Sequence, residues 1–119
     1  MWNFEEDLAA RNRLVANIVT LLANGQFDEL ERLSNGNRLS SSEMRIKITS
    51  YGCHFLPFPD GNFKKIDYIA IVGSTPMRWS VVVPLFTEEE GPSDLSVELT
   101  LVELGEYCYA IEIDNIHVR

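Results

Sequence analysis

The apolar residues of this chain change their spacing once, near residue 60. Before that point they recur every three or four residues, the period of one face of a helix, and after it they tend to alternate with polar residues, the period of one face of a strand. Helices followed by a run of strands predict an α+β domain, with the helices on one face of an antiparallel sheet. At 119 residues the chain is long enough for one core and too short for two, so we expect a single domain over residues 1–119.

Three helices are expected in the first part of the chain, at residues 4–23, at residues 27–33 and between Ser40 and Gly52. In the first helix only Arg11 interrupts the apolar face. The third helix has the clearest start, because Ser40 and Glu43 stand at the spacing of a capping box. Gly52 ends it, since glycine readily adopts the left-handed conformation that closes a helix.

Four strands are expected after the irregular segment 53–62, at residues 66–72, 78–86, 95–101 and 107–114. The connections between them are short enough for hairpins, so the sheet is most simply a four-stranded antiparallel meander. Beyond Ile113 the alternation slips by one residue. A bulge near Asp114 and Asn115 would restore the phase, turning Ile116 and Val118 inward and His117 outward.

The net negative charge is confined to the last third of the chain, which holds the last three predicted strands. Residues 1–80 hold nine acidic and nine basic side chains, whereas residues 81–119 hold nine acidic ones and Arg119, so this part carries the whole net charge of −8. Such a chain is a poor match for nucleic acid or an anionic membrane surface, because both require basic groups. The acidic face serves either solubility or the docking of a basic protein.

The docking hypothesis names a partner-binding surface. Its acidic residues are Glu88, Glu89, Glu90, Asp94, Glu98, Glu112 and Asp114, and its apolar anchors are Trp79 and Phe86. The outer face of the sheet is also expected to carry apolar residues such as Ile69 and Val82, which favours an interface over plain solvent cover. Homodimerisation through that face is the competing explanation, at the cost of repulsion between two acidic surfaces.

No catalytic, metal or cofactor site is expected. Cys53 and His54 are adjacent in an extended segment, so their side chains point to opposite sides and do not readily form a reactive pair. The cysteine and histidine spacings match no zinc motif, and no phosphate-binding loop or nucleophile elbow is present. Two cysteines, Cys53 and Cys108, are too few for a disulfide scaffold. With no membrane-spanning run and an acidic start, the sequence predicts a cytoplasmic protein.

A pocket is the main alternative to a docking surface. Helices over a curved antiparallel sheet can leave a cone-shaped cavity, as in the nuclear-transport-factor-2-like fold. Its lining would be Tyr51, Phe55, Tyr68, Trp79 and Tyr109, with His54 as the acid or base. The competing interpretation is that these aromatic rings fill the core.

Two stretches carry a resemblance. Residues 79–95 read WSVVVPLFTEEEGPSDL and residues 113–118 read IDNIHV, with RLS at 38–40 and YG at 51–52. Together they resemble an uncharacterised bacterial family of small α+β domains of unknown function. The resemblance implies a bacterial, cytosolic, single-domain protein, and it supplies no catalytic residues.

The sequence therefore leads to a non-enzymatic binding protein of the immunity type, which neutralises a basic partner such as a bacterial nuclease toxin. Its carboxylates would pair with the Lys and Arg residues that otherwise hold nucleic acid. The alternatives are a small-molecule-binding or catalytic pocket domain and a homodimeric scaffold.

Overall fold

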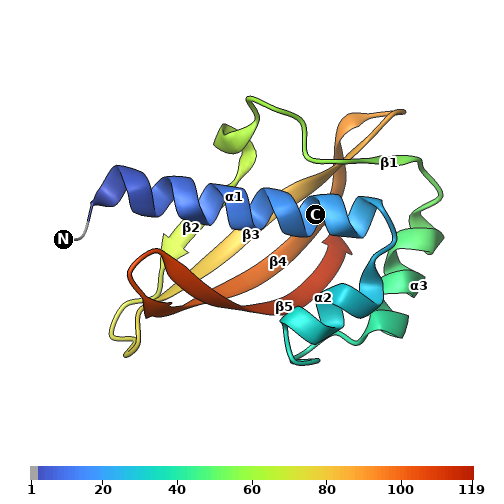
Figure 1. Ribbon diagram of the computed structural model, residues 1–119. Coiled ribbons are helices and arrows are strands. Elements are labelled where there is room, and N and C mark those ends of the chain that lie inside the picture. Colours follow the sequence, from blue (N-terminus) through green and yellow to red (C-terminus); the bar gives the residue numbers. More distant parts are fainter. Residues whose placement is uncertain (1–2) are drawn as a thin grey trace.

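The computed structural model describes residues 3–119 and has the expected α+β architecture (Figure 1). The helices are α1 (Phe4–Ala23), α2 (Phe27–Leu33), α3 (Ser41–Tyr51) and the short 3₁₀ helix η1 (Phe63–Lys65). The strands are β1 (Phe55–Leu56), β2 (Asp67–Ala70), β3 (Arg78–Thr87), β4 (Gly91–Gly105) and β5 (Cys108–Val118). The three α-helices match their predicted ranges.

The sheet is an antiparallel meander in which β2, β3, β4 and β5 are neighbours in that order. A fifth strand, β1, was not predicted. It pairs with the far end of β3 through Phe55 opposite Thr87 and Leu56 opposite Phe86. Two residues are too few to show alternation, so only the tertiary structure reveals this strand.

All three α-helices lie on one side of the sheet, and α1 crosses its strands (Figure 1). The core lies between these two layers. Ile18 and Leu22 of α1 belong to the same buried cluster as Val81, Leu99 and Ile113 of the sheet. Within residues 3–119, no helix covers the opposite face of the sheet.

Local signals in the sequence set the ends of α3. Ser40 Oγ accepts the N–H of Glu43, and the Glu43 carboxylate accepts the N–H of Ser40, which completes the predicted capping box. Gly52 has a φ of 77° and ends the helix in the left-handed conformation. The chain then turns toward β1, which positions the segment discussed below.

The predicted bulge in β5 is present at Asp114, where the register slips between Glu98 and Leu99 of β4. As expected, Ile116 faces the core and is fully buried. Val118 differs from the expectation because it is 60% exposed. It lies at the last position of the strand, where it lines an open groove beside α3 rather than the core.

Candidate functional site

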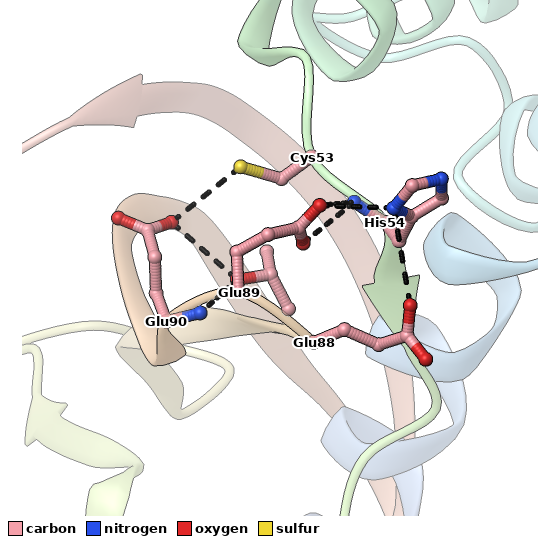
Figure 2. A network of polar contacts seen from close by, with 6 residues as sticks. Cys53, His54, Glu88, Glu89 and Glu90 are labelled. Carbon is pink, nitrogen blue, oxygen red and sulfur yellow. Dashed lines mark hydrogen bonds and ion pairs between the residues drawn. The ribbon is translucent and has the colours of Figure 1, made fainter.

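The turn between β3 and β4 carries three consecutive glutamates, Glu88, Glu89 and Glu90 (Figure 2). Facing it is the segment that leaves α3, which contains Cys53 and His54. We call these glutamates, with Tyr51, Cys53, His54 and Thr87, the turn cluster. It joins residues that the sequence analysis had assigned to two different hypotheses, the docking surface and the pocket.

Glu89 holds the backbone and the side chain of His54 together. Its carboxylate accepts the N–H of His54 at 3.0 and 3.2 Å, and one oxygen lies 2.9 Å from His54 Nδ1. Glu88 is more distant, at 3.8 Å from the same nitrogen. The hydrogen bond from the His54 backbone lowers the pKa of Glu89 below its ordinary value, so Glu89 remains a carboxylate at neutral pH.

Glu90 holds the other side of the turn cluster. The Tyr51 hydroxyl donates to its carboxylate at 2.9 Å, and Cys53 Sγ lies 3.8 Å from the same oxygen. The N–H of Glu90 donates to Thr87 Oγ1 at 3.0 Å. Cys53 and His54 therefore turn to different glutamates, and no contact between their side chains is drawn in Figure 2.

The surroundings of Cys53 disfavour a thiolate. Burial raises the pKa of its thiol, and the negative charges of Glu89 and Glu90 raise it further. Because the thiolate is the nucleophilic form, this thiol is poorly suited to covalent chemistry at neutral pH. The hydrogen bonds of the cluster join the segment after α3 to the β3–β4 turn, which is a structural role.

The other predicted surface acids form a second group on the sheet face that has no helix over it. The Asp114 carboxylate forms an ion pair with Arg38 Nε at 3.2 Å, and it accepts a hydrogen bond from Thr100 Oγ1 at 2.7 Å. Glu98 contacts His117 Nε2. Glu112 stands opposite Thr100 in the register, and Asp94 lies nearer to the turn cluster, at the start of β4.

The two predicted apolar anchors lie elsewhere. Trp79 has the same parity along β3 as the buried residues Val81 and Val83, so it points under α1. Phe86 has the opposite parity, but the register shifts between Pro84 and Phe86, and its ring is only 2% exposed. It packs edge-on against Phe58, with ring centroids 5.4 Å apart. Neither ring belongs to the acidic surface.

The six residues of the pocket hypothesis fall into two separate places. Tyr51 and His54 belong to the turn cluster, and Phe55 follows them in β1. The other three pocket residues, Tyr68, Trp79 and Tyr109, come from three strands, and they all contact the first half of α1. The space between α1 and these three rings is occupied by an ion pair.

That ion pair joins Arg11 and Asp7, which are both about 1% exposed. Arg11 Nε donates to Asp7 Oδ2 at 3.1 Å, and the Tyr109 hydroxyl donates to Asp7 Oδ1 at 2.5 Å. The guanidinium carbon lies 3.9 Å from the centre of the Trp79 ring and 4.6 Å from that of Tyr68. Burial raises the pKa of both tyrosines, so they remain neutral donors.

Sequence reasoning noticed Arg11 only as an interruption of the apolar face. The missed signal is Asp7, one helical turn earlier, because side chains four residues apart on a helix are neighbours. A charged residue on an apolar face with an opposite charge at that spacing indicates a buried pair. The sequence contained that indication.

None of the helices within residues 3–119 is long and apolar enough to cross a membrane. In the same residues, no three His, Cys, Asp or Glu side chains are grouped so that they could hold a metal ion.

The fold and the turn cluster define a small α+β domain whose strands carry its negative charge. The chain belongs to the family described as Domain of unknown function (DUF7668), whose model matches residues 19–119. The matched residues include the whole turn cluster and the second group of acidic residues on β4 and β5, whereas Asp7 and Arg11 precede the match. Comparison with curated proteins and with solved structures gave no match.

The hydrogen bonds of Glu89 lead to a prediction about pH. We expect Glu89→Gln to lower the midpoint of thermal unfolding at pH 7, since the neutral amide would lack the charge that strengthens both bonds to His54. Because folding lowers the pKa of Glu89, its stabilisation is present above the ordinary value of 4.5 and is lost as the pH falls through the lowered value. Midpoints of the two proteins should therefore converge in strong acid, and a difference that is constant with pH would contradict this role.

Proposed function

We propose that this domain is a non-enzymatic, immunity-type binding protein that docks a basic protein partner through its acidic strands and the β3–β4 turn. The partner class that fits best is a protein that binds nucleic acid, such as a bacterial nuclease toxin, and the domain acts in the bacterial cytoplasm. Carboxylates that pair with the partner's Lys and Arg side chains occlude its nucleic-acid site.

One observation carries the proposal. Of the seven acidic residues of the proposed surface, Asp114 is the one for which the structure of residues 3–119 shows an ion pair with an arginine or lysine, its partner being Arg38. Glu88, Glu89 and Glu98 lie against histidine side chains. A surface with this much uncompensated charge attracts a basic partner over long distances and repels acidic ones.

The two alternatives have less support. The predicted pocket among Tyr68, Trp79 and Tyr109 requires space that Arg11 and Asp7 occupy. The structure has a hollow of about 260 Å³ beside α1, and of these three rings only Tyr68 lines it; its other lining residues are Leu8, Asn12, Phe63, Lys64 and Ile66. A homodimer stacked through the face without helices would bring two copies of Glu98, Glu112 and Asp114 together, which costs like-charge repulsion.

The test is a comparison of two triple variants. In the first, Glu88→Lys, Asp94→Lys and Glu112→Lys reverse charges of the proposed surface that make few contacts in the fold. The matched control, Asp28→Lys, Asp60→Lys and Asp67→Lys, makes the same change in the electrically neutral part of the chain. Each reversal adds two charges, so three of them bring both variants from −8 to −2.

Each protein is immobilised, incubated with lysate of the organism that encodes the chain, and washed with increasing salt. We expect the wild type and the control to retain one basic protein that salt releases, and the first variant to lose it. With the purified partner, the first variant should associate about tenfold more slowly and show a weaker dependence on salt. Equal retention by all three proteins would contradict the proposal.

A further inference from the structure

A groove lies between α3 and the end of β5. Its volume is about 340 Å³, and its lining residues are Ile46, Lys47, Ser50, Tyr51, Leu95 and Val118. Most of this lining is apolar, and two of its side chains are strongly exposed: Ile46 by 61% and Val118 by 60%. Exposed aliphatic side chains at a concave surface are typical of a place where a partner inserts a side chain.

The strand beside the groove has a free edge. β5 is the last strand of the sheet, and the N–H of Arg119 donates to the carbonyl of Asp94 at 2.9 Å. Since N–H groups alternate in direction along a strand, the backbone groups of Ile116 and Val118 point away from β4. The N–H of Ile116 confirms this direction, because it is bonded to the side chain of its neighbour Asn115 at 2.9 Å.

The chain covers another part of the same edge. Near the bulge, the N–H of Leu39 donates to the carbonyl of Ile113 at 3.3 Å, and Arg38 forms a parallel bridge with Ile113. This contact shows that the outer edge of β5 accepts a backbone hydrogen bond from another segment, although Arg38 itself has a φ of 75° and is not extended. Beyond the bulge, no other segment of residues 3–119 forms a backbone hydrogen bond with the outward N–H and C=O of Val118, which lines the groove.

Acidic groups lie on both faces of the strands that border the groove. Tyr51, which forms one wall, donates its hydroxyl to Glu90. Asp94 precedes the lining residue Leu95 in β4, so its side chain turns to the opposite face. Among residues 3–119, no arginine or lysine forms an ion pair with Glu90 or Asp94 in the structure. The lysine in the lining, Lys47, lies in the field of Glu43, whose pKa it helps to lower.

We infer that the groove and the outer edge of β5 bind an extended segment of the basic partner by strand addition. The segment pairs its backbone with Val118, places an aliphatic side chain between Ile46 and Leu95, and directs Lys or Arg side chains to Glu90 and Asp94. This inference rests on the proposed function and replaces Trp79 and Phe86 as the apolar anchors. Backbone pairing supplies affinity, and the groove and the carboxylates supply specificity.

The probe is a fluorescein-labelled hexapeptide of alternating lysine and valine, because a strand presents alternate side chains to opposite faces. We expect saturable binding by fluorescence polarisation, with amide shifts in nuclear magnetic resonance spectra centred on Ile46, Tyr51 and Val118. A peptide with glutamate in place of lysine should not bind. The lysine peptide with N-methylated valines, which cannot pair as a strand on that edge, should bind at least about tenfold more weakly.

Two variants test the two parts of the contact. Ile46→Lys places a charge in the groove, and its matched control is Ile69→Lys, which changes a side chain of similar exposure (64%) on β2. Val118→Pro removes the outward N–H without removing a bond to β4, a position where a proline is tolerated in an edge strand. We expect Ile46→Lys and Val118→Pro to weaken peptide binding at least about tenfold, and Ile69→Lys to leave it unchanged.

The outcomes separate this inference from the function on which it rests. Binding that is insensitive to N-methylation and to Ile46→Lys, with amide shifts confined to Glu88 and its neighbours, would overturn strand addition and leave the acidic docking surface standing. Absence of binding by the lysine peptide, together with equal retention of lysate proteins by the charge variants above, would overturn both.

Discussion

Replacing Arg11 with alanine is expected to lower the free energy of unfolding by about 3–5 kcal/mol. The substitution leaves the carboxylate of Asp7 buried without its cation, and it opens a space between the rings of Trp79 and Tyr68. Domains of this size are stable by roughly 5–15 kcal/mol, so the loss is a large part of the total. Urea unfolding followed by circular dichroism measures it directly.

Two comparisons show whether the buried charge is the cause. Arg13→Ala changes an exposed arginine of the same helix and should alter stability by no more than about 0.5 kcal/mol. The double variant Asp7→Leu with Arg11→Met removes both charges and keeps most of the volume, so it should recover most of the stability lost in Arg11→Ala. Equal effects of Arg11→Ala and Arg13→Ala would show that the ion pair contributes little.

The helical half of the fold could be predicted almost completely from local information. The period of the apolar residues gave the extent of α1, and the capping box of Ser40 and Glu43 with Gly52 gave both ends of α3. These signals act between residues within one or two helical turns, and the final structure retains them. The meander was predictable for a similar reason, because short connections favour pairing of consecutive strands.

The residues that escaped prediction depend on contacts between distant parts of the chain. Phe86 was predicted as a surface anchor, but its ring is 2% exposed because it is covered by Phe58, from the segment after β1. Strand β1 exists because residues 55–56 meet the end of β3. A two-residue strand and a ring covered by a distant loop leave no periodic pattern, so only the assembled sheet shows them, whereas the bulge in β5 was visible as a slip in the alternation.

The negative charge of the candidate site could be predicted from the sequence, but the hydrogen bonds within the site could not. The run from Glu88 to Glu90 identified the acidic turn, yet its bonds to Tyr51 and His54 span 35 to 39 residues of sequence. The turn cluster therefore combines two functions that composition cannot separate. Its carboxylates fasten the segment after α3 to the sheet, and they leave a net negative charge at the surface beside the groove.

Ile116→Ala is expected to lower the free energy of unfolding by about 2–5 kcal/mol, the usual range when a buried isoleucine is truncated. The bulge at Asp114 turns this side chain inward, where it is fully buried in the cluster shared by the helices and the sheet. Without that extra residue, Ile116 would lie on the face that has no helix over it. Urea unfolding of the variant measures this loss, which is the contribution that the bulge makes to the free energy of unfolding by burying this one side chain.

The matched control is Val118→Ala, two residues further along the same strand. The two side chains share a parity, but Val118 lines the groove instead of the core, so its truncation should change stability by no more than about 0.5 kcal/mol. Similar losses in both variants would mean that α3 closes over the groove in solution, and strand addition at β5 would then require α3 to move. A large loss of stability in Ile116→Ala alone would show that the fold does not depend on the side chain of Val118. That side chain is then free to contact a partner.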